Sequence, residues 1–231
     1  MYRSVYLCLI LSTISLADNN IINNDIVDST SGIDLNIEIS KTDVVNVTVY
    51  YESLCSDCQK FFAKKLGHVI LLLNAFMNIK LIPYGHAERS CDSDGKYLFK
   101  CQHGPKECYG NMLHACAIHT LNNEAVSGIF NTCLMVEGEG SDDISVRNCG
   151  KYLEKYEDAE TIIKCANSEL GAELLYHYGE LTEAYNPKWV PTVLLNGSSE
   201  NQDQIQDHLL PSICQLLTKP PPICKSSYIT N

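Results

Sequence analysis

Hydrophobic and polar positions along the chain predict a strand, a helix and a second strand in succession. Residues 44–51 (VVNVTVYY) are β-branched and aromatic, which favours a strand. Residues 79–84 form a second apolar run that ends at Pro83 and Gly85. Between the two runs, apolar residues recur every three or four positions, the period of an amphipathic helix. They are Phe61, Phe62, Leu66, Val69, Ile70, Leu73 and Phe76.

The next hundred residues follow a different pattern. The stretch 86–185 contains seven cysteines, helical periodicity at 111–121, 152–156 and 159–178, and an acidic loop at 137–143. After it, a strand over 189–195 starts at a proline, and Asn196-Gly197-Ser198 is a turn signal. A final helix is predicted over 203–217, ended by the prolines at 220–222.

The amino terminus has the pattern of a secretory signal peptide. Arg3 precedes an apolar run over 5–14, and Ser15-Leu16-Ala17 resembles a cleavage site. The run is shorter than the roughly 20 residues that span a bilayer, so we expect no membrane span. The predicted division is a signal peptide at 1–17, a leader or pro-segment at 18–42, an α/β domain at 43–85 and 186–218, a helical cysteine-rich insertion at 86–185, and a tail at 219–231.

The composition restricts which cellular compartment and which binding partners are expected. The chain has 231 residues, 12 cysteines and a net charge of −11. An acidic chain is a poor partner for nucleic acid or an anionic membrane surface. Cysteines at this density behind a signal peptide indicate an oxidising compartment, where disulfides persist. The sequons at Asn46 and Asn196 fit that location, and we expect at least one to be glycosylated.

Cys55 and Cys58 form a C-x-x-C pair where the first strand ends and the helix begins. Backbone N–H groups and the helix dipole favour a thiolate at the first position. We therefore expect Cys55 to be the attacking nucleophile and Cys58 the resolving thiol. In thioredoxin-like folds a later strand begins at a cis-proline whose backbone faces the cysteine pair, and Pro191 matches that role in order and context.

A C-x-x-C pair can also belong to a zinc site or form a purely structural disulfide. A zinc site needs further ligands, yet no second C-x-x-C or H-x3-5-H follows, so no metal is expected. A structural disulfide fits poorly with a strand, C-x-x-C and helix followed by a Val-Pro-Thr strand. Redox chemistry without a cofactor is the favoured interpretation.

A further motif resembles a known family. The pattern C-Q-H-G-x2-E-C-x2-N-x4-C is present without a gap, at Cys101, Gln102, His103, Gly104, Glu107, Cys108, Asn111 and Cys116. With the Tyr-Tyr-Glu-Ser approach to Cys55 and the downstream Val-Pro-Thr-Val-Leu-Leu-Asn-Gly, it resembles the gamma-interferon-inducible lysosomal thiol reductase family over about 44–224.

This resemblance implies a soluble glycoprotein of α/β class, with a thioredoxin-like fold and a helical, disulfide-rich insertion between the second strand and the cis-proline strand. It implies reduction of protein disulfides at acidic pH in endosomes or lysosomes, or after secretion, assisting protein breakdown or antigen processing. The expected partners are disulfide-bonded proteins and a small-thiol reductant. The alternatives are a secretory-pathway oxidase or isomerase, and a secreted binding protein on the same scaffold.

The remaining cysteines are assigned by count. Loss of Cys8 with the signal peptide and removal of the redox pair leave nine, an odd number. Cys91, in a polar loop, is the candidate free thiol, which allows a monomer or a disulfide-linked dimer. The other eight are expected to form disulfides that brace the insertion: Cys101, Cys108, Cys116, Cys133, Cys149, Cys165, Cys214 and Cys224. His103 has two interpretations, a proton donor near the site or, preferably, a structural histidine.

Activity at acidic pH requires that the pKa of Cys55 be lowered. A cysteine with a pKa near 8.5 is only about one part in 3,000 thiolate at pH 5. We therefore predict a Cys55 pKa below about 7. Asp57 works against this, because a nearby carboxylate disfavours a thiolate while it is ionised.

Overall fold

The computed structural model describes residues 43–137 and 141–226. The predicted signal peptide and leader lie outside these residues. The strands are β1 (Val45–Tyr51), β2 (Met77–Pro83), β3 (Glu88–Cys91), β4 (Tyr97–Lys100) and β5 (Thr192–Leu195). The helices are α1 (Ser56–Phe61), α2 (Gly67–Leu73), α3 (Pro105–Leu121), α4 (Glu124–Val136), α5 (Asp143–Tyr152), α6 (Tyr156–Ala166), α7 (Glu169–Tyr185), α8 (Gln202–Asp207), α9 (Leu209–Leu216) and α10 (Pro222–Ser226).

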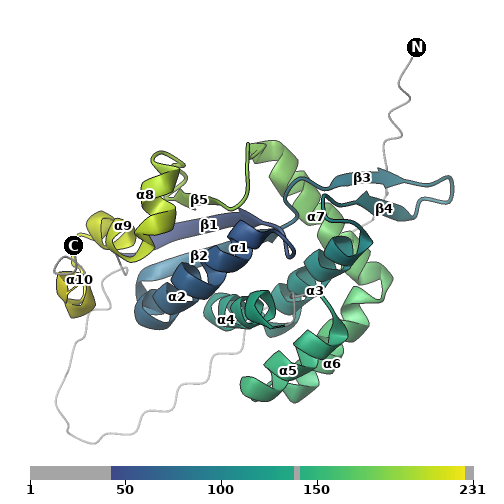
Figure 1. Ribbon diagram of the computed structural model, residues 1–231, viewed down its shortest axis with the longest axis horizontal. Coiled ribbons are helices and arrows are strands. Elements are labelled where there is room, and N and C mark those ends of the chain that lie inside the picture. Colours follow the sequence, from purple (N-terminus) through teal and green to yellow (C-terminus); the bar gives the residue numbers. More distant parts are fainter. Residues whose placement is uncertain (1–42, 138–140, 227–231) are drawn as a thin grey trace, which may run out of the picture. The chain divides into compact units, whose positions relative to one another are not determined.

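Three strands form the central sheet in the order β2-β1-β5 (Figure 1). β1 runs parallel to β2, with Val47 beside Ile79, and antiparallel to β5, with Val49 beside Val193. A parallel strand-helix-strand unit, a long insertion and an antiparallel strand that starts at a cis-proline define a thioredoxin-like α/β fold. The succession of strand, helix and strand predicted from the apolar pattern, and the later strand, are confirmed.

The helix after β1 is continuous but not uniform. A π-helical segment, Phe62–Leu66, lies between α1 and α2, and a 3₁₀ turn, Asn74–Phe76, follows them. The predicted apolar positions Phe62, Leu66 and Ile70 are buried against the sheet. π segments are rare and often lie near functional sites. Here the segment begins directly after the C-x-x-C helix.

The insertion has a core of its own. Leu113, Phe130, Val146 and Ile162, from α3, α4, α5 and α6, are buried together. Helices α3, α4 and α7 contact β2, and Figure 1 shows the insertion beside that edge of the sheet. On the sheet face beneath α7, Tyr50 stacks on Tyr185 with ring centroids 4.8 Å apart.

Several predicted elements of the insertion are wrong. Residues 152–156 mostly connect α5 to α6, with Glu154 at φ 55°. The helix predicted over 159–178 is two helices, because Asn167 and Ser168 bond to the last carbonyls of α6 instead of continuing it. Helix α4 and the β3–β4 hairpin were not predicted, and Cys91 ends β3 rather than lying in a loop.

The carboxyl-terminal region also differs from the prediction. The helix predicted over 203–217 is broken at His208 into α8 and α9. Pro211 explains the break, because it has no N–H for an uninterrupted helix and fits the first turn of a new one. Residues 219–231 are not simply a tail, since α10 is joined to α9 by the Cys214–Cys224 disulfide. No helix in the described part of the chain has the length and apolar character to cross a membrane.

Gly110 sets how closely the insertion approaches the redox region. A Cβ at this position of α3 would collide with the Ser53 hydroxyl and lie 2.8 Å from the Ser141 Cβ. Within a helix, alanine stabilises the folded protein by about 0.5–1 kcal/mol relative to glycine, but overpacking destabilises it by about 1–3 kcal/mol. We expect Gly110→Ala to lower the free energy of unfolding by about 1–2 kcal/mol in denaturant titrations. His119→Ala, at an exposed position of α3, is the control, and an equal loss there would contradict the close-approach argument.

Candidate active site

Cys55 is the N-cap residue of α1. Its sulfur accepts a hydrogen bond from the Cys58 N–H at 3.3 Å, so it lies at the positive end of the helix. Cys58, one turn into the helix, is fully buried, whereas Cys55 is partly exposed. Both are free thiols. The partly exposed sulfur is therefore available to a substrate, and the buried one is available only to Cys55.

The pKa values of the two thiols move in opposite directions. A hydrogen bond from the Cys58 thiol is the largest influence on Cys55 and, with the N–H groups of Cys58 and Asp57, lowers its pKa to about 7 against the cost of burial. Burial raises the pKa of Cys58 well above its ordinary value. At pH 5 a thiol with a pKa of 7 is about one part in 100 thiolate, roughly 30 times more than an unperturbed cysteine. The Cys55 pKa lies at the upper limit of the predicted range.

The Asp57 carboxylate has only a small effect on the pKa of Cys55 in the structure. It raises the pKa of Cys55 less than the Asp57 N–H lowers it. The carboxylate also forms an exposed ion pair with Lys60 at 3.0 Å. Asp57 therefore leaves Cys55 activated.

The Val190–Pro191 peptide bond is cis, as predicted. The Cys55 thiol donates to the Val190 carbonyl at 3.7 Å, which places the residue before the proline beside the nucleophile. A groove of about 580 Å³ extends from here along α1 and α8, and its lining includes Trp189, Pro191, Phe61 and Gln206. Trp189 is 53% exposed, so the groove offers an aromatic surface next to Cys55.

The family motif packs against the loop that precedes Cys55. Asn111 accepts the Ser53 N–H at 2.9 Å, and the Ser53 hydroxyl donates to the Glu107 carbonyl at 3.2 Å. Gln59 of α1 donates to the Ser53 carbonyl at 3.1 Å. Ser53 is thus held from both α1 and α3, and the Glu107 and Asn111 side chains lie close to the redox pair, which sequence reasoning did not anticipate.

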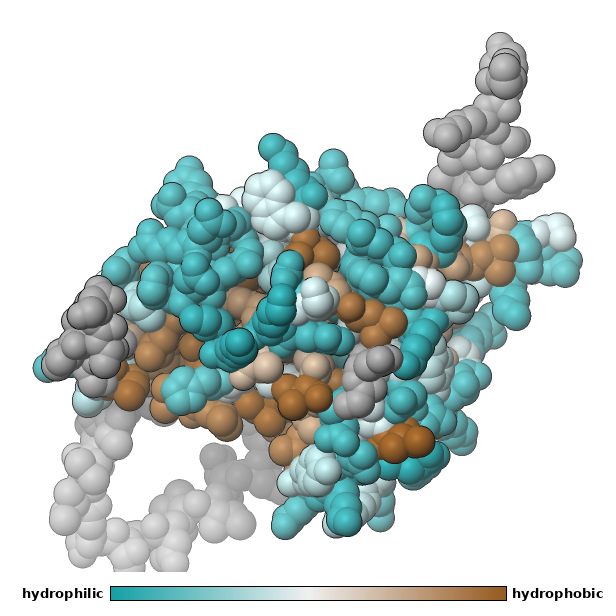
Figure 2. Space-filling view, viewed as in Figure 1, coloured by the Kyte–Doolittle hydropathy of each residue, from teal (hydrophilic) through white to brown (hydrophobic). Residues whose placement is uncertain are grey.

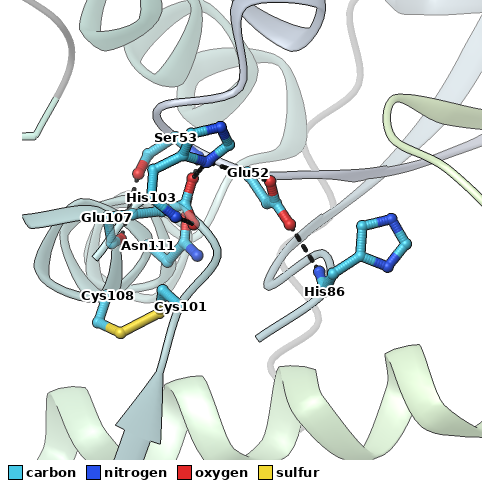
Figure 3. Close-up of a disulfide and its surroundings, with 8 residues drawn as sticks. All are labelled: Glu52, Ser53, His86, Cys101, His103, Glu107, Cys108 and Asn111. Atoms are coloured by element: carbon cyan, nitrogen blue, oxygen red, sulfur yellow. Dashed lines mark hydrogen bonds and ion pairs between the residues drawn. A yellow bond between two sulfur atoms is a disulfide. The ribbon is translucent and has the colours of Figure 1, made fainter. Parts of the chain in front are cut away.

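Glu52 is the residue that sequence reasoning missed. It is fully buried between β1 and α1, and its Oε1 accepts the His86 N–H at 2.6 Å (Figure 3). Burial is the main cause that raises its pKa to about 7, and Glu107 and Cys55 add to the rise. The available signal was a carboxyl residue between an apolar strand and a C-x-x-C pair, where a charge is costly to bury.

His103 joins Glu52 to the motif. Its Nδ1 lies 2.5 Å from Glu107 Oε2 and 3.6 Å from Glu52 Oε2. Glu52, His103 and Glu107 each have one atom that could bind a metal ion, and these atoms all lie within 4.8 Å of one another, as in groups that hold cations. Hydrogen bonds between His103 and Glu107 already engage the ring nitrogen and both Glu107 oxygens, and we interpret the group as an acid–base cluster.

The other cysteines of the described residues are in disulfides. Cys101–Cys108, Cys116–Cys165 and Cys133–Cys149 lie in the insertion, whereas Cys214–Cys224 joins α9 to α10 and does not brace the insertion. Cys91 is also disulfide-bonded in the chain that still carries Cys8. The free-thiol prediction concerns the chain after Cys8 is lost, and it stays a prediction. The prediction rested on an odd count after removal of Cys8, and parity cannot show which sulfur atoms meet in space.

The rest of the motif and the sequons lie at the surface. Gly104 precedes α3 with φ 86°, a conformation that favours glycine, and Gln102 is exposed in the adjoining turn. Asn46 and Asn196 are both exposed and neighbour each other, since Asn196 Oδ1 accepts the Asn46 N–H at 2.9 Å.

A free C-x-x-C pair at a helix N-terminus, beside a cis-proline in a thioredoxin-like fold, defines the class of thiol-disulfide oxidoreductases. The family model described as gamma interferon inducible lysosomal thiol reductase matches residues 46–153. The chain is 35% identical to the Mus musculus protein of that name over 186 residues, which cover 79% of this chain and 72% of the relative. It therefore belongs to the gamma-interferon-inducible lysosomal thiol reductase family and is a thiol-disulfide oxidoreductase.

Two further proteins are similar to the chain. A Carassius auratus protein named gamma-interferon-inducible lysosomal thiol reductase is 35% identical over 179 residues, covering 75% of this chain and 67% of the relative. The solved structure of Pseudomonas aeruginosa DsbA E82I aligns with a TM-score of 0.42 and 15% identity, covering 74% of this chain and 88% of that one. The family membership rests on the sequence relatives.

The Cys58 thiol should control the ionisation of Cys55. Removing this hydrogen-bond donor in Cys58→Ala should raise the Cys55 pKa by about one unit, toward the ordinary value of about 8.5. Cys58→Ser keeps an O–H donor and should leave the pKa closer to 7. The measurement is the pH dependence of Cys55 alkylation by iodoacetamide, and equal midpoints in the two variants would contradict the assigned cause.

Proposed function

We propose that this protein reduces disulfides in protein substrates at acidic pH, in the lumen of endosomes or lysosomes or after secretion. The observation that carries the proposal is the division between a partly exposed, activated Cys55 and a fully buried Cys58 beside the cis-proline groove. The names of the relatives, lysosomal thiol reductases, support the setting.

The reaction follows from the positions of the two sulfur atoms. The Cys55 thiolate attacks one sulfur of the substrate disulfide and forms a mixed disulfide, and the departing substrate thiolate takes up a proton. Cys58 then loses its proton and attacks the Cys55 sulfur, releasing the second substrate thiol. The enzyme ends with a Cys55–Cys58 disulfide, having passed two electrons to the substrate. A small-thiol reductant restores the dithiol.

The groove supports an extended polypeptide as the substrate. Its lining combines the aromatic rings of Trp189 and Phe61 with charged groups of Lys60, Lys64 and Asp203. Pro191 contributes to the wall beside Cys55, so a chain lying in the groove would bring its disulfide to that sulfur. We propose that the enzyme is a monomer or a dimer linked through Cys91.

The decisive assay is reduction of a denatured immunoglobulin-like protein at pH 5 and pH 7, with cysteine as the reductant. Wild type should reduce the substrate at pH 5, and Cys55→Ser should lose all catalysed reduction. Cys58→Ser should accumulate a mixed disulfide on Cys55, detectable by mass spectrometry, because it lacks the resolving thiol. His119→Ala serves as the active control. No reduction at either pH would favour a binding role, and net oxidation alone would favour an oxidase.

A further inference from the structure

The Glu52 carboxyl is a buried acidic group that the thiol chemistry described above does not use. Its side chain is 1% exposed, and Oε2 has no hydrogen-bond partner among residues 43–137 and 141–226. A buried, unpaired carboxylate is costly, so the group must either acquire a counter-charge or keep its proton. Which of the two happens depends on its neighbours.

The nearest side chain that can carry a positive charge, His103, already has a carboxylate partner. His103 presents its ring Nδ1 to Glu107 Oε2 at 2.5 Å and its backbone N–H to Glu107 Oε1 at 3.0 Å. Both oxygens of Glu107 therefore bind His103, and the two residues form a closed pair. Glu52 Oε2 lies 3.6 Å from the same Nδ1, beyond hydrogen-bond distance. An imidazolium at this position would be compensated by Glu107 before Glu52.

Apart from the His86 N–H, which lowers the pKa of Glu52 less than burial raises it, the other groups that face Glu52 do not stabilise its charge. Helix α1 presents the sulfur atoms of Cys55 and Cys58, and ionised Glu52 disfavours the thiolate of Cys58. From the loop after β2, His86 offers only its backbone N–H, and Figure 3 shows its ring directed away from Glu52. Gly85 leaves the room that the Glu52 side chain occupies, since a Cβ there would collide with it.

We propose that the His103–Glu107 pair leaves Glu52 to carry a proton at acidic pH, so that no buried negative charge opposes the thiolate of Cys55. Glu52 and His103 act through Cys55 and are positioning residues in this scheme. The motif residues thereby adapt the nucleophile to an acidic lumen. The inference rests on the proposed role of Cys55 as the attacking thiol.

The charges of Glu52 and Cys55 determine how the stability of the Cys55 thiolate changes with pH. The pKa of Glu52 is about 7, so the carboxyl is neutral at pH 5 and ionised at pH 8. Glu52 and Cys55 are both negative when ionised, so each charge disfavours the other, and Cys55 adds to the rise in the pKa of Glu52. Below pH 7 the thiolate forms beside a neutral carboxyl, whereas above pH 7 the carboxylate opposes it.

The test is a cycle of Glu52→Gln, Glu107→Gln and the double variant, read by the rate of Cys55 alkylation with iodoacetamide and mapped by peptide mass spectrometry. In Glu107→Gln, His103 is released to pair with Glu52, which then ionises at lower pH. The alkylation rate at pH 5.5 should fall about three- to tenfold, the effect of a half to one pKa unit. Glu52→Gln should match wild type at pH 5.5 and react up to about twofold faster near pH 7, where wild-type Cys55 is about half thiolate.

The double variant distinguishes an electrostatic effect of Glu107, acting through Glu52, from a structural effect on Cys55. Without a carboxyl at position 52, loss of Glu107 should no longer slow alkylation at pH 5.5. A slow double variant would overturn the proposal, because the Glu107 carboxylate would then affect Cys55 by a route that does not involve the charge of Glu52. Glu160→Gln, which removes an exposed carboxylate paired with Arg147, is the matched control and should change nothing.

A second measurement does not depend on the folding of the Glu107 variants. The infrared difference spectrum between wild type and Glu52→Gln at pH 5.5 should contain the C=O band of one protonated, buried carboxyl, and this band should vanish on titration to pH 8. Absence of the band at pH 5.5 overturns the proposal. Neither measurement needs a substrate, so a failed reductase assay would not be mistaken for failure of this inference.

Discussion

The redox site depends on the packing of the first turns of α3 against the two residues that precede the C-x-x-C helix. Asn111 and Glu107 hold the Ser53 backbone and hydroxyl, while Gln59 holds its carbonyl from the other side. These contacts fix the loop from which Cys55 caps α1. Because a helix N-terminus activates a sulfur only within its first turn, small movements of this loop would weaken the stabilisation of the thiolate.

The insertion is thus part of the active site as well as a separately packed body. Its core of α3–α6 residues and its disulfides hold α3 in place, and its Cys101–Cys108 bridge closes the loop that carries His103. Figure 2 shows hydrophobic residues interspersed among hydrophilic ones over the face that contains α1. This oxidoreductase therefore combines a thioredoxin-like sheet, which supplies the cysteine pair and cis-proline, with a helical body that places His103 and Glu107 beside Glu52.

Local patterns predicted the parts of this molecule whose residues are adjacent in sequence. The β-branched run of β1, the helical spacing of Phe62, Leu66 and Ile70, and the C-x-x-C position at a helix start all follow from short-range geometry. Prediction failed where a few polar side chains decide the outcome, as at Asn167, where a helix ends, and at Pro211, where another begins. The cysteine count could not predict which cysteines pair, because counting carries no information about distance.

The sequence by itself determined the class of chemistry, since two cysteines separated by two residues before an amphipathic helix can exchange electrons with a disulfide. It also determined the family, through a motif of fixed spacing that begins at Cys101. Only the tertiary structure decided what that motif does at the site. Glu52 and Glu107 are 55 positions apart, yet their carboxyl groups meet at one imidazole, and the protonation of Glu52 depends on burial and on charges brought together by folding.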